Sequence, residues 1–400
     1  MGASIIRVER KSYRTLSNFL PLRRGESDCT AKNNLPLEQG AVQAAHGMSR
    51  SLASVADLVD ARLITQGAAR GLDDVAQRYS IAITPEIAAL IDRDDPNDPI
   101  ARQFIPDIRE AATTPQERAD PIGDDVHSPL PGLVHRYPDR VLLKLLSICP
   151  VYCRFCFRRE TVGRGKGDLS PERDVAAALD YIADRPQIFE VILTGGDPMM
   201  LSARRLEVVA RRLSEIPHVA LLRVHTRAPT AAPDLVTGDR LAALRESGKT
   251  LLVALHVNHE RELTARARAA VARLRESGAI LLSQTVLLKG VNDDVEVLER
   301  LMRDLASLGV RPYYLHHPDL APGTAYFRVS LAAGRRLYAE LARRVTSVAL
   351  PAYVLDIPGG FGKARVADGA AQPDGQGGWT IVDRNGEKRS YRDELEPPRE

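Results

Sequence analysis

The strongest constraint on the fold is a regular alternation of apolar runs and amphipathic segments between residues 140 and 346. Runs such as VLLKLLS, EVILTGG and TLLVALHVN are each followed by a segment with helical spacing, such as SARRLEVVARRLSEI or VEVLERLMRDLASLG. Six such pairs follow one another. Continuous apolar strands that alternate with amphipathic helices are typical of a parallel sheet covered by helices. We therefore predict an α/β fold built on a parallel sheet.

Polar residues follow these apolar runs closely, at Cys149, Asp197, His225, His256 and Asp319. When a parallel sheet closes into a barrel, the C-terminal ends of its strands form the mouth that carries the chemistry. The placement favours a partial (β/α)6 TIM-like barrel, with an open doubly wound sheet as the alternative. No GxGxxG motif follows the first strand, which argues against a dinucleotide-binding fold.

The flanking segments differ from this core in pattern. Residues 1–50 mix charged and small polar residues without a sustained period, so we expect a poorly ordered extension. Residues 51–134 predict a region of short amphipathic helices, and residues 135–348 form the predicted β/α core. Residues 349–400 predict a further strand and a glycine-rich loop in PAYVLDIPGGFGK, followed by a polar tail of low order.

Charge and composition narrow the class of protein. The 400 residues include 55 basic and 52 acidic side chains, and a net charge of +3 gives no reason to expect a nucleic-acid partner. No apolar run approaches the roughly 20 residues needed to span a bilayer, and the N-terminus lacks the apolar stretch of a secretory signal. We expect a cytoplasmic protein with no membrane partner. Three of the four cysteines lie within eight positions, which favours a metal or redox role.

Cys149, Cys153 and Cys156 form a C-x3-C-x2-C motif in CPVYCRFC, directly after the first predicted core strand. A complete 4Fe-4S site uses four thiolates, so three in one loop would leave one iron open to an exchangeable ligand. The alternatives are a zinc site or three unrelated thiols. Structural zinc takes four protein ligands, and no matching cysteine or histidine pair follows. We predict a 4Fe-4S cluster and no zinc.

The cysteine motif and its position resemble those of radical S-adenosylmethionine enzymes. Together with HRYPDRVLLKL, LTGGDPMML, SQTVLLKGVNDD, RPYYLHHPDL and DIPGGFGK, it resembles the lysine 2,3-aminomutase family over roughly residues 55–365. The resemblance implies a barrel of the radical SAM type and an isomerase that converts L-lysine to β-lysine by 2,3-amino migration. It implies three cofactors: the cluster, S-adenosyl-L-methionine and pyridoxal 5'-phosphate.

The resemblance also implies roles for individual residues. Gly195, Gly196 and Asp197, in a glycine-rich segment after the second strand, correspond to the family's contact with adenosylmethionine, and Gln284 is implied at the same site. Lys363 corresponds to the lysine that carries pyridoxal phosphate, and a desolvated lysine in a glycine-rich loop suits that chemistry. A surface lysine in a flexible loop is the alternative.

Three arginines are implied as anion-binding residues. Arg136 and Arg140, in HRYPDR, are candidates for the cofactor phosphate. Arg158 corresponds to the family's arginine for the substrate carboxylate, and a bidentate guanidinium fits a carboxylate. A solvated basic face formed by Arg158 and Arg159 is the alternative.

Asp319 and Asp356 follow or end apolar strands, where a buried acid without a partner is unfavourable. The resemblance implies that both bind the side-chain ammonium of lysine, whereas an aspartate that caps a helix or turn is the alternative. His225, His256 and His259 lie near strand ends, but a lone histidine is more often structural.

The chain departs from the family pattern at several positions. It reads ALHVNHE where the family reads NTHFNHP, has Phe361 in place of a glycine, and has only Cys29 beyond the cysteine motif. Three alternatives stay open: the same chemistry serving β-lysylation of elongation factor P, another substrate such as arginine or ornithine, and a binding protein that has lost catalysis. We expect a homo-oligomer that receives electrons from a donor such as flavodoxin or ferredoxin.

Overall fold

The computed structural model describes residues 50–163 and 169–393. All of them fall within one compact unit that begins at Gly40. Cys29, the predicted extension up to residue 49 and the last seven residues of the chain lie outside the described residues.

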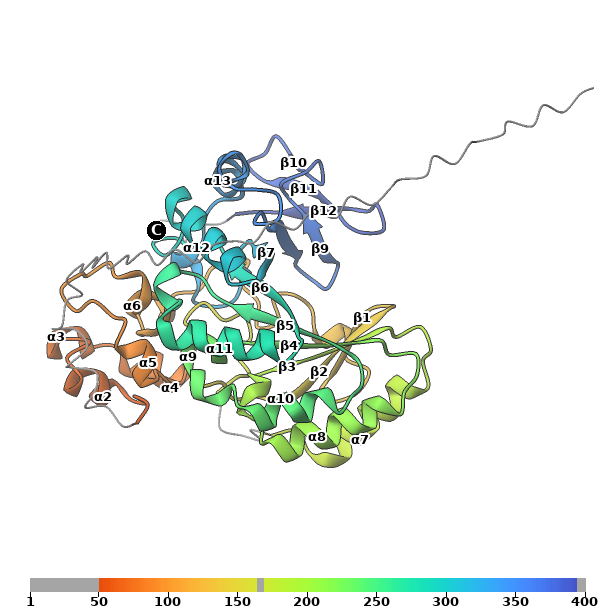
Figure 1. Cartoon of the computed structure of the whole chain (residues 1–400). Coiled ribbons are helices and arrows are strands. Elements are labelled where there is room, and N and C mark those ends of the chain that lie inside the picture. The colour runs from red at the N-terminus through yellow and green to blue at the C-terminus, as the bar shows by residue number, and fades with distance from the viewer. Residues whose placement is uncertain (1–49, 164–168, 394–400) are drawn as a thin grey trace, which may run out of the picture. The chain divides into compact units, whose positions relative to one another are not determined.

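The core is one nine-stranded sheet in which the strands lie in chain order from β1 to β9 (Figure 1). Seven neighbouring strands are parallel, which confirms the predicted β/α barrel. They are β2 (Arg140–Leu146), β3 (Glu190–Gly195), β4 (Leu221–Thr226), β5 (Thr250–His256), β6 (Ile280–Val286), β7 (Arg311–His316) and β8 (Ala352–Ile357).

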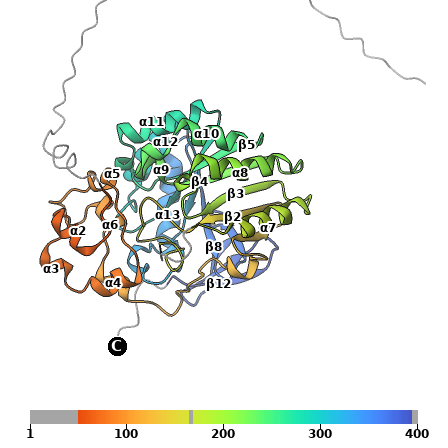
Figure 2. The same cartoon turned by 90° about the horizontal axis from the view of Figure 1, so that it is seen from below.

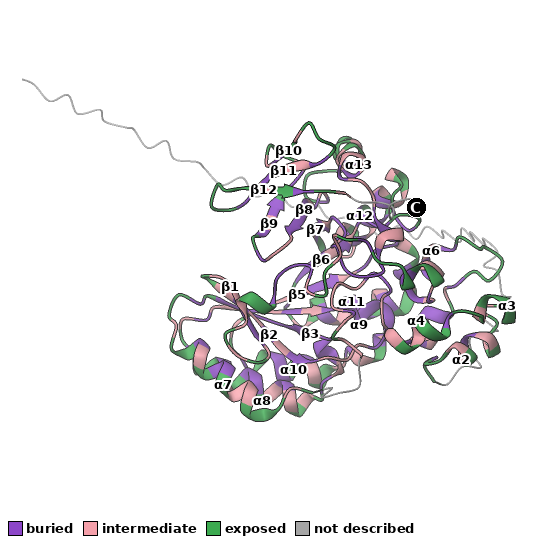
Figure 3. Ribbon diagram, turned by 180° about the vertical axis from the view of Figure 1, so that it is seen from behind, coloured by how far each residue is buried: buried purple, intermediate pink, exposed green. Residues whose placement is uncertain are grey.

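Helices cover the outer side of this sheet (Figure 2). They are α7 (Glu172–Ala183), α8 (Ala203–Ser214), α9 (Ala228–Ala231), α10 (Gly238–Arg245), α11 (Ala265–Glu276), α12 (Val295–Ser307) and α13 (Leu331–Arg344). In α12, Leu298, Leu301, Met302 and Leu305 are buried, a spacing that places all four on one face. Figure 3 shows buried strands and helices that are exposed on their outward faces.

Two antiparallel strands form the edges of the sheet, namely β1 (Leu133–Tyr137) beside β2 and β9 (Gly362–Arg365) beside β8. Side chains join the two edges. The Tyr137 hydroxyl accepts a hydrogen bond from the Lys363 backbone N–H at 2.9 Å, and His127 Nε2 lies 2.9 Å from Gly360 O. The barrel is therefore closed between β1 and β9 by side chains and loops, and Lys363 lies at this junction.

The N-terminal region consists of short helices, as predicted. These are α2 (Val55–Asp60), α3 (Gln66–Ala69), α4 (Asp73–Arg78), α5 (Pro85–Ala88) and α6 (Pro99–Phe104), followed by the 3-10 turns η1 (Ile108–Ala111) and η2 (Asp125–His127). Their apolar residues form a separate cluster that includes Ile87, Ile100 and Phe104. Val151, from the cysteine loop, packs into the same cluster, so this region supports that loop directly.

The prediction of a poorly ordered polar tail is wrong for residues 371–391. They form a three-stranded antiparallel sheet of β10 (Ala371–Pro373), β11 (Trp379–Val382) and β12 (Lys388–Tyr391). These strands have only three or four residues, too few to show a hydrophobic period, and cross-strand pairing forms the sheet instead. Among the described residues, no helix is long and apolar enough to cross a membrane.

Candidate active site

Three free cysteines lie in the loop that follows β2: Cys149, Cys153 and Cys156. Burial raises the pKa of all three thiols, and that of Cys153 to about 11. In the described part of the chain, no three His, Cys, Asp or Glu side chains surround one ion position. A 4Fe-4S cluster binds its thiolates on different iron atoms, so three separate thiols fit a cluster with one open iron. The predicted absence of zinc stays a prediction.

The glycine pair at the end of β3 packs against the cysteine loop. The Gly196 N–H donates to Leu146 O at 2.6 Å, and the Asp197 N–H donates to Ile148 O at 2.9 Å. A Cβ on Gly196 would lie 2.1 Å from Ile148 O, and one on Gly195 would lie 2.4 Å from Leu146 O. Close backbone packing therefore requires glycine at both positions, independently of the predicted cofactor contact.

Both carboxylate oxygens of Asp197 accept hydrogen bonds from the protein. The donors are the Thr226 hydroxyl, at 2.8 and 2.9 Å, and the backbone N–H groups of Met199, Arg227 and Ala228. Burial raises the pKa of Asp197, although these hydrogen bonds favour the charged form. Asp197 thus joins the loops after β3 and β4. A direct contact between its carboxylate and a cofactor stays a prediction.

Arg227, which the sequence reasoning missed, is buried next to the cysteines. Its Nη1 lies 3.2 Å from Cys153 Sγ, and its Nη2 donates to Gln103 Oε1 at 2.8 Å and to Glu262 Oε2 at 2.6 Å. The guanidinium therefore provides a hydrogen-bond donor to one candidate cluster ligand, while Glu262 balances its charge. Hydrogen bonds to ligand sulfurs and local charge are among the features that tune iron–sulfur clusters.

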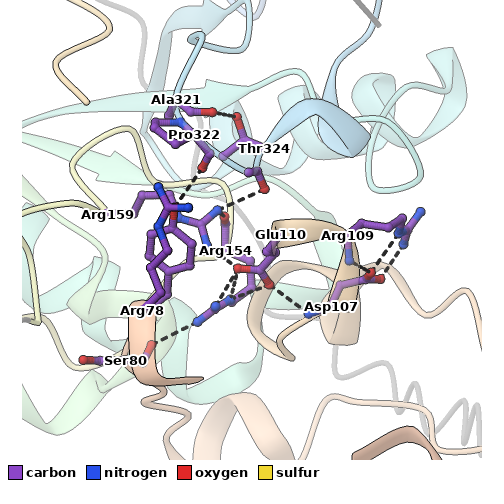
Figure 4. A network of polar contacts seen from close by, with 12 residues as sticks. Arg78, Ser80, Asp107, Arg109, Glu110, Arg154, Arg159, Ala321, Pro322 and Thr324 are labelled. Carbon is purple, nitrogen blue, oxygen red and sulfur yellow. Dashed lines mark hydrogen bonds and ion pairs between the residues drawn. The ribbon is translucent and has the colours of Figure 1, made fainter. Parts of the chain in front are cut away.

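A second buried ionic network holds the cysteine loop against the N-terminal region (Figure 4). Glu110 accepts hydrogen bonds from Arg154 Nε at 2.9 Å and Arg154 Nη2 at 2.6 Å, and it also pairs with Arg159. Arg159 Nη1 donates to Gly323 O at 3.2 Å, in the segment after β7. Arg159 is buried, so the alternative of a solvated basic face is wrong for this residue.

Lys363 and Asp356 form an ion pair across the β8–β9 hairpin. The two residues are direct partners in the strand register, and Lys363 Nζ donates to the two Asp356 oxygens at 2.8 and 2.7 Å. Burial opposes the charge on Asp356, but the Lys363 ammonium and His316 together outweigh burial and lower the pKa of Asp356. Arg136 Nη1 and His316 Nδ1 lie 3.6 and 3.7 Å from the same carboxylate. Lys363 thus lies in a strand, not in a flexible surface loop.

Asp319 follows β7 and faces the same group of charges. No hydrogen bond or ion pair joins its carboxylate to another described residue, so it caps no helix or turn there. Burial, with the nearby negative charge of Asp356, raises the pKa of Asp319 to about 8. The site therefore holds one paired acid and a second acid that lacks a cation.

Arg136 and Arg158 share one acid that the sequence reasoning missed. Asp124 accepts from Arg136 Nη2 at 2.8 Å and from Arg158 Nη2 at 3.2 Å. The Nε atoms of both arginines are buried without a hydrogen-bond partner, which suits a site that binds an anion such as phosphate or carboxylate. Arg140 is not part of this group, since its side chain pairs with Asp139 and lies over the Tyr137 ring.

Gln284 lies on β6 beside the histidines of neighbouring strands. Its Nε2 is 3.3 Å from His225 Nε2, and its register partner on β5 is His256. Burial lowers the pKa of both histidines. His259 has a structural role, since its Nδ1 accepts from the Arg261 backbone N–H at the start of η5 (Glu260–Glu262).

Comparisons with a family model and with individual proteins agree with the cysteine motif. Residues 143–302 match the model described as the Radical SAM superfamily. The chain is 38% identical to the L-lysine 2,3-aminomutase of Fusobacterium nucleatum, over 79% of this chain and 74% of that protein. It is 40% identical to a putative L-lysine 2,3-aminomutase of Aquifex aeolicus, over 71% of this chain and 77% of that protein. A solved radical SAM methyltransferase from Sphaerobacter thermophilus aligns at 23% identity with a TM-score of 0.40, over 56% of this chain and 68% of that chain.

The identities extend over most of both chains, beyond the β/α core that the superfamily model covers. The chain belongs to the L-lysine 2,3-aminomutase family within the Radical SAM superfamily and is an isomerase of the aminomutase type.

Proposed function

We propose that this isomerase converts L-lysine to β-lysine by 2,3-amino migration, with a 4Fe-4S cluster, S-adenosyl-L-methionine and pyridoxal 5'-phosphate as cofactors. The observation that carries the proposal is the pairing of Asp356 with the ammonium of Lys363, beside the unpaired Asp319. When bound, the cluster and adenosylmethionine would supply the radical, and pyridoxal phosphate would carry the migrating amino group. An electron donor such as flavodoxin or ferredoxin would reduce the cluster.

Asp356 supports lysine as the substrate because it already binds the same functional group within the protein. The Lys363 side chain ends in the same primary ammonium as free lysine, and Asp356 accepts from it with both oxygens. In the proposed complex, Lys363 would anchor pyridoxal phosphate and thereby leave Asp356. The ammonium of the substrate would then replace it between Asp356 and Asp319.

The arginines support a ligand with negative groups at its other end. Asp124 fixes the guanidinium groups of Arg136 and Arg158 side by side, while the Nε atom of each stays without an acceptor. In the proposed complex, Arg136 would bind the cofactor phosphate, and Arg158 would bind the carboxylate of the amino acid. These two contacts and the acid pair would hold the substrate at both ends, which fixes its orientation.

The cysteine loop and its neighbours support the remaining assignments. Cys149, Cys153 and Cys156 would each bind one iron, and adenosylmethionine would bind the fourth iron near Gly196. Gln284 would contact the same ligand from β6. The glycine pair contributes by bringing the backbone of β3 against the cysteine loop.

The proposal is tested with anaerobically reconstituted protein and L-lysine, L-ornithine or L-arginine as substrate. We expect a β-amino acid from lysine in preference to the other two. Asp356→Asn removes one charge-assisted hydrogen bond, so kcat/KM for lysine should fall by about ten- to a hundredfold. Asp139→Asn is the matched control, since Asp139 is an exposed acid paired with Arg140. Equal turnover of lysine by the parent and by Asp356→Asn would contradict the assignment, and better turnover of ornithine or arginine would change the substrate.

A further inference from the structure

A cavity of about 210 Å³ lies beside the candidate carboxylate arginine. It is bounded by residues 119–125, the end of β2 and the segment after Cys156, and Arg158 contributes to its wall. Lys144 contributes a second cation to the same wall. None of the assignments made above uses this lysine.

The strand pattern explains why Lys144 points into this site. Alternate residues of β2 face opposite sides of the sheet, and Val141, Leu143 and Leu145 are buried in the core on one side. Leu142 and Lys144 face the other side. Lys144 also lies beside β3, because a Cβ on Gly195 would be 3.1 Å from Lys144 Cβ. The lysine therefore stands between the glycine pair and Arg158.

The ammonium of Lys144 lacks a partner. No hydrogen bond or ion pair joins its Nζ to another residue in the described ranges, although burial lowers its pKa. A partly buried charge without a counter-charge is unfavourable, so such a group indicates an absent anion. The Nε atom of Arg158, which is buried without a hydrogen-bond partner, also indicates an absent anion.

The acids near the cavity do not balance these cations. Asp124 is already shared between Arg136 and Arg158. Asp120 accepts from the backbone N–H groups of Asp124 and Asp125, at 2.9 and 2.8 Å, which holds their loop. Asp125 itself is exposed to solvent. Arg136 also lies 3.6 Å from the buried Asp356. Of the three cations Arg136, Lys144 and Arg158, only Lys144 therefore has no acid partner in the described ranges.

We propose that Lys144 and Arg158 form a two-cation subsite for the carboxylate of an amino acid ligand. The proposal rests on the proposed function, under which two ligands carry such a carboxylate: the amino acid substrate and the methionyl part of S-adenosylmethionine. The position of Lys144, beside Gly195 as well as Arg158, brings it within the region assigned to both. Lys144 is thus a further binding residue that selects for a free carboxylate.

The test compares the equilibrium affinity of reconstituted protein for ligand pairs that differ only in the carboxylate. One pair is L-lysine and L-lysinamide, and the other is S-adenosylmethionine and its decarboxylated form. Lys144→Met should weaken binding of the carboxylate-bearing member of one pair by about ten- to a hundredfold and leave its partner unchanged. The pair that responds identifies the ligand that the subsite binds. Lys144→Arg, which keeps the charge, should retain most of the affinity.

Leu142→Met is the matched control, since it changes an uncharged residue on the same face of β2. If Lys144→Met binds all four ligands like the parent, or loses affinity equally for both members of each pair, the subsite does not exist. β-Lysine formation by the parent protein is measured separately. A parent that forms no β-lysine but discriminates by carboxylate through Lys144 refutes the proposed function and leaves the subsite standing.

Discussion

Replacement of Glu110 by glutamine tests how strongly the buried ionic network holds the cysteine loop. The Glu110, Arg154 and Arg159 side chains are 0%, 2% and 4% exposed, so solvent screens none of them. Glutamine keeps the side-chain oxygen that accepts from the Asp107 backbone N–H, but it removes the negative charge. Two buried guanidinium groups would then lack a counter-charge.

Loss of one partner from a buried ion pair typically costs about 3 to 5 kcal/mol. Arg159 keeps some compensation, since its guanidinium lies 3.5 Å from the centre of the Tyr79 ring. We therefore expect Glu110→Gln to lower the free energy of unfolding by about 3 to 5 kcal/mol. Urea unfolding followed by far-ultraviolet circular dichroism measures this change.

Arg109→Gln is the matched control in the same segment. The Arg109–Asp107 pair is 51% and 30% exposed, and pairs of this kind contribute about 0 to 1 kcal/mol. Arg154 directly follows Cys153, so Glu110→Gln should also retain less iron after anaerobic reconstitution. If Glu110→Gln unfolds within about 1 kcal/mol of Arg109→Gln, the network does not contribute as argued.

Three further predictions concern the cysteine loop and the acid pair. Cys153→Ala should lose iron–sulfur absorption and adenosylmethionine cleavage, and anaerobic protein that contains zinc instead of iron would refute the cluster. Gly196→Ala should lower thermal stability and weaken adenosylmethionine binding, because the new Cβ would lie 2.1 Å from Ile148 O; Gly238→Ala, where a Cβ meets nothing within 4 Å, should be neutral. The pKa of Asp319 is raised from 3.8 to about 8 on folding, so its carboxyl favours the native state most below about pH 4 and loses this contribution as the pH rises to about 8. Asp319→Asn should therefore gain stability relative to the parent over this range, and a constant difference from pH 4 to 8 would contradict the shift.

The sequence predicted the parts of the fold that carry a strong hydrophobic period. In α12, the buried residues recur with helical spacing, and β3 contains the apolar run VIL at its centre. The pattern could not indicate β10 to β12, whose strands have three or four residues and mix exposed and buried positions. Their stability comes from cross-strand partners that a local period does not contain.

The sequence indicated those candidate site residues that stand in motifs, and it did not indicate the distant residues that pack against them. The cysteines and Lys363 stand in recognisable local patterns. Glu110 and Asp124 come from irregular segments far from those motifs in sequence, and a buried acid there has the same local pattern as a surface acid. Arg154 offered one signal, because an arginine between two clustered cysteines has little room to reach solvent.

The ion pair between Lys363 and Asp356 links the proposed attachment point of the cofactor to the proposed binding site for the substrate ammonium. The Lys363 ammonium donates to both Asp356 oxygens, and the same nitrogen is the group that would react with the carbonyl of pyridoxal phosphate. Attachment of pyridoxal phosphate would therefore remove the cation that Asp356 neutralises. A buried carboxylate without a counter-charge is unfavourable, and Arg136, at 3.6 Å from its oxygen, compensates only in part. Under the proposed function, loading of the cofactor thus creates the binding site for a cationic substrate, which disfavours an amino acid with an acidic side chain.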